Sequence, residues 1–157
     1  MTDNRNRKAF LDMIAHSEIG PRLLAASNNG YNVIVGSTPA QPLLFGAYAD
    51  HPRRSVQVGQ GLWSTAAGRY QLLARYYDAY RKQLGLQDFS PASQDAIALQ
   101  QIRERGALPL IDAGRFDEAV ARVRNIWASL PGAGYGQHEN NLSALRTAYV
   151  AAGGALA

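Results

Sequence analysis

Residues 64–71 read Ser-Thr-Ala-Ala-Gly-Arg-Tyr-Gln, and they mark the point where an irregular stretch of sequence gives way to a long helical pattern. The apolar positions of that pattern are Tyr70, Leu73, Tyr77, Tyr80 and Leu84. Because these positions recur every three to four residues, the chain is expected to turn helical from Gly68 onward. Gly85 is well placed to end this helix.

Upstream of this stretch, the sequence begins with another helical pattern. Phe10, Ile14 and Ser17 fall on one face, which predicts a helix from about residue 5 to residue 17. Gly20-Pro21 is expected to prevent the helix from continuing. Glu18 therefore stands at the C-terminal end of the first predicted helix, 50 residues before Gly68.

The region between these two helices is predicted to be a small, irregular β-lobe. Asn28-Asn29-Gly30 is a turn signal, and the β-branched run from Tyr31 to Val35 predicts a short strand. Residues 38–50 are rich in Pro and Gly and are expected to form a loop. Residues 55–58 predict a second short strand.

The rest of the sequence predicts three more helices. Ser90-Pro91 is a favourable start, with Ser as the N-cap residue and Pro at the first helical position, for a helix that runs to about Arg105. Its inward positions are expected to be Ala92, Ala96, Leu99 and Ile102 or Arg103. Two further sets of apolar positions indicate the other helices: Phe116, Val120, Val123 and Trp127, and then Leu142, Leu145 and Tyr149. The predicted fold class is α+β, mainly helical with a small β-lobe, as one domain over residues 1–157.

The composition limits the classes of protein to consider. With 157 residues, 46% hydrophobic and 18% charged, the chain is typical of a soluble globular protein. It contains no cysteine, so disulfides and thiol catalysis are excluded. It has no apolar run of about 18 residues, so no membrane span is predicted. The polar start, residues 1–8, lacks the apolar segment of a secretory signal, so synthesis in a cytoplasm is expected.

The charge points to an anionic partner. The formal net charge is +4 and the sequence pI is about 9.6. The basic residues are spread along the chain with only short pairs such as Arg53-Arg54, which gives little support to nucleic acid as the partner. An anionic polymer such as a bacterial cell wall fits the charge equally well.

Glu18 is the strongest candidate for chemistry. A glutamate taken at random is more often a solvated helix end, but the surroundings of Glu18 are unusual. The unpaired carbonyls at the end of the helix disfavour a negative charge, and the neighbouring sequence is apolar as far as Arg22. Both effects raise the pKa of the carboxyl group, as a general acid for a glycosidic oxygen requires.

The sequence between Glu18 and Asp50 contains no other Asp or Glu. A glycosidase with two catalytic carboxylates needs the second about 5–10 Å from the first. One carboxylate suffices when the nucleophile belongs to the sugar. In that case the 6-hydroxyl of a muramoyl residue attacks its own anomeric carbon, and Glu18 acts first as acid and then as base. Asp50 remains open as a second carboxylate, because a loop can bring it close.

Other kinds of site have less support. The histidines His16, His51 and His138 are widely spaced and form no metal-binding pattern, so neither metal nor cofactor is expected. The glycine-rich residues 132–136 lack the preceding strand and the Lys-Ser/Thr pair of a nucleotide-binding loop. They are interpreted either as a turn between helices or as the wall of a saccharide cleft, with Tyr135 and Gln137 facing the sugar.

Segments throughout the chain resemble, in the same order, the lambda-type phage endolysins. They are KAFLDM at 8–13, SE at 17–18, GYNVIVG at 30–36, DHPRR at 50–54, AGRYQLL at 67–73, YRKQLGLQDFSP at 80–91, ALQQIRERGALPLID at 98–112 and NIWASLPGAGYGQ at 125–137. The resemblance implies a lysozyme-like fold with a saccharide cleft and lytic transglycosylase activity. It also implies cleavage between N-acetylmuramic acid and N-acetylglucosamine to a 1,6-anhydro product, with Glu18 as the acid/base.

The resemblance also implies a set of substrate-binding residues: Tyr31, Asn32, Gly68, Arg69, Tyr70, Gln71, Tyr135 and Gln137. The implied partner is the peptidoglycan glycan strand. A monomeric enzyme made in the host cytoplasm would reach the periplasm after a holin permeabilises the membrane. Three features depart from the family: the segment between Glu18 and Gly30 diverges and is more apolar at 19–24, Asn32 replaces an acidic residue, and residues 36–50 form a longer loop. A hydrolytic muramidase of the same fold and a non-catalytic glycan-binding module remain as alternatives.

Overall fold

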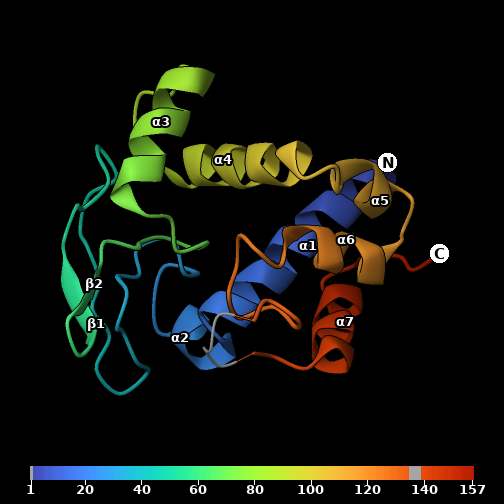
Figure 1. Cartoon of the computed structure of the whole chain (residues 1–157), viewed down its shortest axis with the longest axis horizontal. Helices are drawn as coiled ribbons and strands as arrows, with labels where there is room; N and C mark the ends of the chain where they lie inside the picture. Colours follow the sequence, from blue (N-terminus) through green and yellow to red (C-terminus); the bar gives the residue numbers. More distant parts are fainter. Residues whose placement is uncertain (1, 135–138) are drawn as a thin grey trace. The chain divides into compact units, whose positions relative to one another are not determined.

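A computed structural model describes residues 2–134 and 139–157 of the chain (Figure 1). Its helices and strands are α1 (Thr2–Glu18), α2 (Pro21–Ala25), β1 (Val56–Gly59), β2 (Leu62–Ser64), α3 (Ala74–Leu84), α4 (Pro91–Glu104), α5 (Leu108–Asp112), α6 (Phe116–Val123) and α7 (Leu142–Ala151). Helices dominate and the only sheet in the described residues has two strands, so the predicted α+β class is confirmed. None of the helices in these residues is long and apolar enough to cross a membrane.

The chain divides into two compact units. One combines residues 1–18 with residues 98–157, and the other consists of residues 19–97. The boundary between residues 97 and 98 falls inside α4, so this helix contributes to both units.

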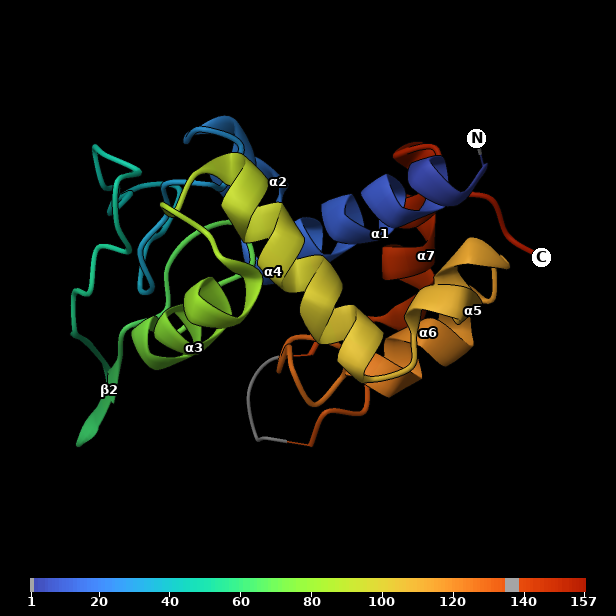
Figure 2. The same ribbon diagram turned by 90° about the horizontal axis from the view of Figure 1, so that it is seen from above.

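In the first unit, α1 packs against α5 and α7 (Figures 1 and 2). Three buried rings form its aromatic centre: Phe10 lies 5.8 Å from Phe116 and 6.5 Å from Tyr149, and Phe116 lies 4.7 Å from Tyr149, measured between ring centroids. The Asn6 side chain on α1 donates to the carbonyl of Ile111 and accepts from the amide of Ala155. These contacts hold the first helix between segments from the far end of the chain.

The second unit has a smaller core around α3 and the start of α4. Its buried members are Ala67, Leu72, Tyr77, Phe89 and Ile97. Strands β1 and β2 form an antiparallel hairpin, which places Val56 opposite Ser64 and Gln57 opposite Trp63. The predicted strand at 55–58 is therefore confirmed within one residue. Its partner, β2, was not predicted from the sequence.

Two predicted elements are wrong. Residues 31–35 form turns, with isolated bridges at Val33 and Ile34, because Gly30 (φ 84°) and Gly36 (φ 85°) bend the chain on either side. The chain does not become helical at Gly68: residues 67–72 form a tight turn closed by two hydrogen bonds between the backbones of Ala67 and Leu72, of 3.1 and 2.9 Å. Helix α3 begins only at Ala74.

The other helices agree better with the prediction. Gly85 ends α3 in the left-handed conformation, and α4 begins at Pro91, with the Ser90 hydroxyl accepting from the amide of Ser93. The predicted inward face of α4 is wrong in part: Ala92 is exposed, and the buried side chains are Ser93, Gln94, Ile97, Ala98 and Ile102. The prediction relied on apolar residues alone, whereas this helix buries two polar side chains, Ser93 and Gln94.

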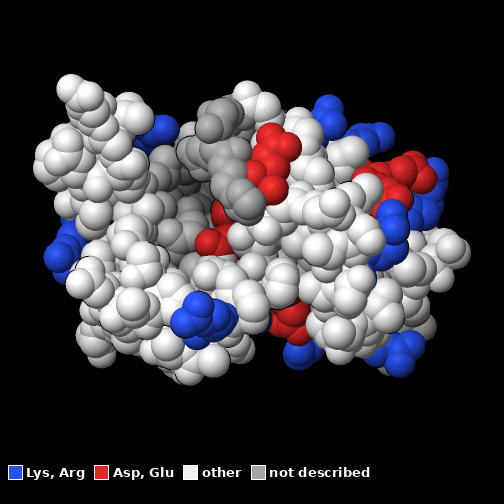
Figure 3. All heavy atoms as spheres, turned by 90° about the horizontal axis from the view of Figure 1, so that it is seen from below, with Lys and Arg blue, Asp and Glu red and all other residues white. Residues whose placement is uncertain are grey.

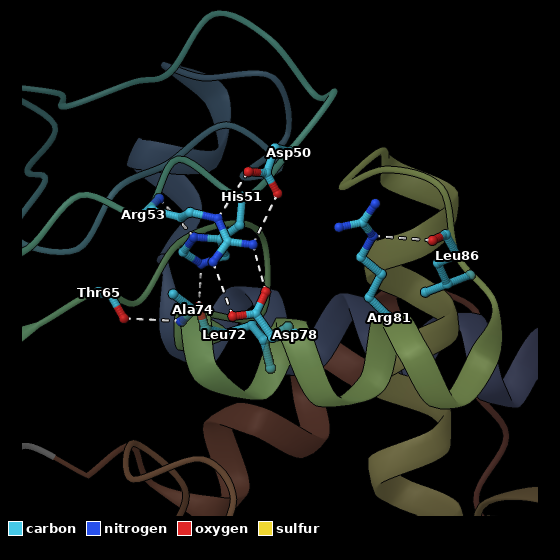
Figure 4. A network of polar contacts seen from close by, with 9 residues as sticks. All are labelled: Asp50, His51, Arg53, Thr65, Leu72, Ala74, Asp78, Arg81 and Leu86. Atoms are coloured by element: carbon cyan, nitrogen blue, oxygen red, sulfur yellow. Dashed lines mark hydrogen bonds and ion pairs between the residues drawn. The ribbon is translucent and has the colours of Figure 1, made fainter.

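A network of polar contacts connects the loop before β1 to α3 (Figure 4). Buried His51 contacts the carbonyl of Leu72 through Nε2 (2.8 Å) and accepts from the Arg53 amide through Nδ1 (2.9 Å). Since a carbonyl only accepts, Nε2 must carry the proton and the ring must be neutral. The Arg53 guanidinium bridges Asp50 and Asp78.

His51 makes the stability of the fold sensitive to acid. Burial lowers its pKa below the ordinary value of 6.5. The folded state therefore resists protonation, and its free energy of unfolding should fall as the pH drops below 6.5 toward the lowered pKa. In urea titrations at pH 7.5, 6.5 and 5.5, the difference in stability between wild type and His51→Gln should shrink as the pH falls. His16→Gln, at a histidine outside this network, is the control, and an unchanged difference for His51→Gln would contradict the prediction.

Candidate active site

Glu18 is the last residue of α1, and one of its carboxylate oxygens is fixed by a neutral group. The Ser129 hydroxyl, in the turn that follows α6, donates to Glu18 Oε2 at 2.8 Å. Burial raises the pKa of Glu18 from 4.5 to about 7, and the hydrogen bond from Ser129 opposes part of that rise. The direction is the one expected from the sequence. A carboxyl group with this pKa can hold a proton and release it near neutral pH.

Two further side chains support Ser129. The Ser17 hydroxyl lies 2.8 Å from Ser129 Oγ, and the Asn140 amide nitrogen lies 2.9 Å from Ser17 Oγ and 3.1 Å from the Ser17 carbonyl. The Asn140 backbone amide also donates to the Ser129 carbonyl at 2.8 Å. Glu18 is thus connected to residues more than 110 positions later in the sequence.

The glycine-rich segment is anchored by a second carboxylate. Glu139 accepts hydrogen bonds from the amides of Gly132 and Gly134, both at 3.0 Å, and these bonds lower its pKa. Glu139 is therefore an ionised anchor of the backbone in this segment. Two of the predicted substrate-binding residues, Tyr135 and Gln137, lie outside the described residues.

The other predicted substrate-binding residues lie in the second unit, where Tyr31 and Tyr70 both donate to Asp95. The Tyr70 hydroxyl donates to Asp95 at 2.6 Å and the Tyr31 hydroxyl at 3.0 Å. The Arg69 guanidinium lies over both rings, 5.3 Å from the Tyr31 centroid and 5.6 Å from the Tyr70 centroid. Arg69 and Tyr70 are each only 5% exposed, so they support the backbone here, whereas Tyr31 is half-buried.

Gly68, Gln71 and Asn32 lie in turns near this cluster. Gly68 has φ 86° and donates its amide to the Val33 carbonyl at 2.8 Å. Gln71, with φ 51°, donates its side-chain amide to the Gly68 carbonyl at 2.8 Å. Asn32 accepts from the Asn28 amide at 2.8 Å. Gly68 and Gln71 therefore fix the turn at 67–72, and the Asn32 side chain fixes the separate turn that begins at Asn28.

Sequence reasoning missed three polar residues that organise these sites. Ser129 lies inside NIWASLPGAGYGQ, one of the segments that carry the family resemblance, so the signal was available. Asn140 and Asp95 lie outside those segments, and nothing in their sequence surroundings distinguishes them. Asp50, the rival carboxylate, is paired with Arg53, and the hydrogen bonds from Arg53 lower its pKa.

Two further properties of the described residues are their capacity to bind a metal ion and the distribution of charge on one face. Residues 2–134 and 139–157 contain no group of three or more His, Cys, Asp or Glu side chains that could hold a metal ion. Figure 3 shows the Lys and Arg side chains of one face in several separate places, with acidic side chains beside some of them. On this face the positive charge is dispersed, as the sequence indicated.

The raised pKa of Glu18 predicts a cost in stability at high pH. The folded state favours the protonated acid, so the stability this provides is complete below pH 4.5 and is lost as the pH rises toward 7. Glu18→Gln should therefore be more stable than wild type at pH 8, by up to about 3 kcal/mol, and equal to it near pH 4. Urea unfolding at both pH values measures this.

Glu118→Gln, at an exposed ion pair with Arg115, is the matched control and should change little at either pH. A gain at pH 4 as large as at pH 8 would contradict the assignment.

Comparisons with known proteins give a consistent set of relatives. The model of the Endolysin family matches residues 8–156. The chain is 58% identical over 152 residues to the endolysin of Escherichia phage lambda, covering 96% of this chain and 93% of that protein. It is 52% identical over 156 residues to the endolysin of Escherichia phage P2, covering 96% and 94%. Among solved structures it resembles bacteriophage lambda lysozyme complexed with a chitohexasaccharide, with a TM-score of 0.89, 56% identity and coverage of 98% and 97%. A second structure of lysozyme from bacteriophage lambda gives a TM-score of 0.87.

Proposed function

The chain belongs to the endolysin family, enzymes of the phage lambda lysozyme type that degrade the bacterial cell wall, and from this premise we propose that it acts as a lytic transglycosylase. The proposed substrate is the peptidoglycan glycan strand, cut between N-acetylmuramic acid and N-acetylglucosamine. The structure of a relative contains a bound chitohexasaccharide, which supports a glycan as the ligand here too. Glu18 is the proposed acid and base.

The reaction needs one carboxyl group used twice. Protonated Glu18 gives its proton to the glycosidic oxygen as the bond from that oxygen to the anomeric carbon breaks. The resulting carboxylate then takes the proton of the muramoyl 6-hydroxyl, whose oxygen forms the new bond to the anomeric carbon. The products are the released N-acetylglucosamine end and a 1,6-anhydromuramoyl end. Glu18 is protonated again, and no water is consumed.

The observation that carries this proposal is the environment of Glu18. Its hydrogen-bond partner is the neutral hydroxyl of Ser129, and its pKa of about 7 suits both halves of the cycle near neutral pH. Asp50 does not resemble a second acid, because Arg53 holds it ionised. An attacking water would need a base, whereas the tethered 6-hydroxyl needs only Glu18.

The substrate contacts are proposed to divide between two roles. Tyr31 and Asn32 are half-buried and suited to touch the saccharide, whereas buried Arg69 and Tyr70 support Tyr31, through its ring and through Asp95. Gly68 and Gln71 shape the turn, and Tyr135 and Gln137 are proposed as further contacts. We also propose that the enzyme acts as a monomer with one catalytic domain over residues 1–157, is made in the host cytoplasm and reaches the periplasm after holin action.

The product distinguishes this mechanism from hydrolysis by a muramidase of the same fold. Mass spectrometry of fragments released from purified peptidoglycan should show 1,6-anhydromuramic ends, one water lighter than hydrolysed ends. A parallel reducing-sugar assay should show no increase. The control is a hydrolytic lysozyme on the same substrate. Mainly hydrated fragments with reducing ends would establish a muramidase and reject the transglycosylase proposal.

A further inference from the structure

Behind Glu18, the side chains of Ser129, Ser17 and Asn140 form a continuous chain of hydrogen bonds. The successive distances are 2.8 Å from Glu18 Oε2 to Ser129 Oγ, 2.8 Å from there to Ser17 Oγ, and 2.9 Å from there to Asn140 Nδ2. All four residues lie in the same compact unit. Each serine hydroxyl has one proton to donate, so the directions of these bonds depend on one another.

The direction can be worked out from the carboxylate end. Ionised Glu18 can only accept hydrogen bonds, so Ser129 must donate its single hydroxyl proton to Glu18 Oε2. In its contact with Ser17, Ser129 must then be the acceptor and Ser17 the donor. Ser17 has no second proton, so it must accept from Asn140.

The Asn140 end imposes the same direction independently. The Asn140 side chain also faces the Ser17 carbonyl at 3.1 Å, and a carbonyl oxygen only accepts. The atom that faces it must therefore be the amide nitrogen, which has two protons and cannot accept. Ser17 is thus forced to accept from Asn140 and to pass its own proton toward Ser129. The two ends of the chain agree.

We propose that Asn140 is a positioning residue that, through Ser17 and Ser129, keeps the acidic proton of Glu18 on Oε1. For Oε2 to carry the proton, it would have to donate to Ser129, which would then lose Glu18 as the acceptor for its own proton. If Ser129 turned that proton toward Ser17, the Ser17 proton would be left with the Asn140 nitrogen, which cannot accept it. Oε2 is held as an acceptor, whereas Oε1 makes no hydrogen bond to residues 2–134 or 139–157 and remains for the substrate.

This inference rests on the proposed role of Glu18 as the acid, and it adds which oxygen of the carboxyl group carries the proton. It predicts that the polarity of residue 140 matters more than its size. Asn140→Asp replaces the donor with an acceptor of the same shape, so the whole chain can reverse. Glu18 Oε2 can then hold the proton and donate it to Ser129, which stabilises the neutral acid and directs the proton away from Oε1.

The first measurement follows Glu18 without any substrate. The sequence has four glutamates, so protein labelled with ¹³C-glutamate gives few carboxyl signals, and the signal lost in Glu18→Gln identifies Glu18. Its titration midpoint should be near 7 in the wild type. In Asn140→Asp it should rise by roughly one pH unit or more, because the carboxyl group changes from acceptor to donor.

The matched control is Asn141→Asp, which adds the same charge one residue away. Asn141 caps α7 by accepting from the amide of Ser143, and Asp serves equally well there. The initial rate of muropeptide release should be about tenfold lower in Asn140→Asp and within about twofold of wild type in Asn141→Asp. If the two variants give the same midpoint and the same rate, the added charge alone explains the effect and the proposal is rejected. A raised midpoint without a slower rate, or the reverse, also rejects it.

A second pair of variants covers the case in which Asn140→Asp does not fold. Ser17→Ala breaks the chain in the middle, and Ser17→Thr keeps a hydroxyl there. The alanine variant should shift the midpoint and slow release, and the threonine variant should restore both toward wild type. Wild-type values for Ser17→Ala would overturn the proposal. If product analysis shows hydrolysis, this inference still stands, because either reaction uses the same acid.

Discussion

Glu18→Gln is expected to reduce the rate of peptidoglycan cleavage by about 10²–10⁴-fold while the fold stays intact. The amide keeps the size of the side chain and can still accept from Ser129, but it cannot give or take a proton at the glycosidic bond. The measurement is the initial rate of turbidity clearing, with circular dichroism to show that the variant is folded. Raised stability of the same variant at pH 8 would show that the fold tolerates the change.

Asp50→Asn is the control for that experiment. It removes a carboxylate that is already paired with Arg53, so the rate of cleavage should fall only mildly. A loss equal to that of Glu18→Gln would indicate two catalytic carboxylates. Near wild-type clearing by folded Glu18→Gln would reject Glu18 as the acid.

Gly68→Ala is expected to cost at least about 3 kcal/mol of unfolding free energy. Gly68 has φ 86°, and a Cβ atom there would overlap Gln94 Oε1 and lie 2.9 Å from Phe89 Cζ. Gln94 cannot move away cheaply, because Oε1 accepts from the Arg69 amide and its amide nitrogen donates to the carbonyls of Tyr31 and Phe89. Urea unfolding of the purified variant measures the loss.

Gly61→Ala separates the two causes of that loss. Gly61 also has a positive φ, 68°, but no atom lies within 4 Å of where its Cβ would be. This variant should lose only about 1 kcal/mol, from backbone strain alone. Equal losses at the two positions would show that the contact with Gln94 is unimportant.

The sequence predicted what depends on local signals. The end of α3 at Gly85, the start of α4 at Ser90-Pro91 and the position of Glu18 at the end of α1 all follow from the preferences of single residues. The turn at 67–72 was missed because it depends on hydrogen bonds between Ala67 and Leu72, which the helical spacing of Tyr70 and Leu73 obscured.

The partners of Glu18 were beyond local reasoning for a different reason. Ser129 reaches Glu18, and Asn140 reaches Ser17, only because α1 packs against α5 and α7, which brings together segments more than 100 residues apart. The same applies to Gln94, a buried polar side chain on a helix whose inward face was assigned from apolar residues alone. Its role depends on the backbone of Tyr31, Phe89 and Arg69.

The division of the chain into two units has a consequence for the order in which the enzyme is built on the ribosome. Residues 19–97 are contiguous and can complete their core while synthesis continues, whereas α1 needs partners from residues 108–151. At about 5–20 residues per second, the ribosome takes roughly 5–20 s to reach Ser129 after Glu18. During that time α1 has neither α5 nor α7 to cover its apolar face, and Glu18 lacks the hydroxyl that fixes its carboxylate. The acid is therefore among the last parts of the protein to be assembled, because its carboxylate is fixed only after Ser129 has been added.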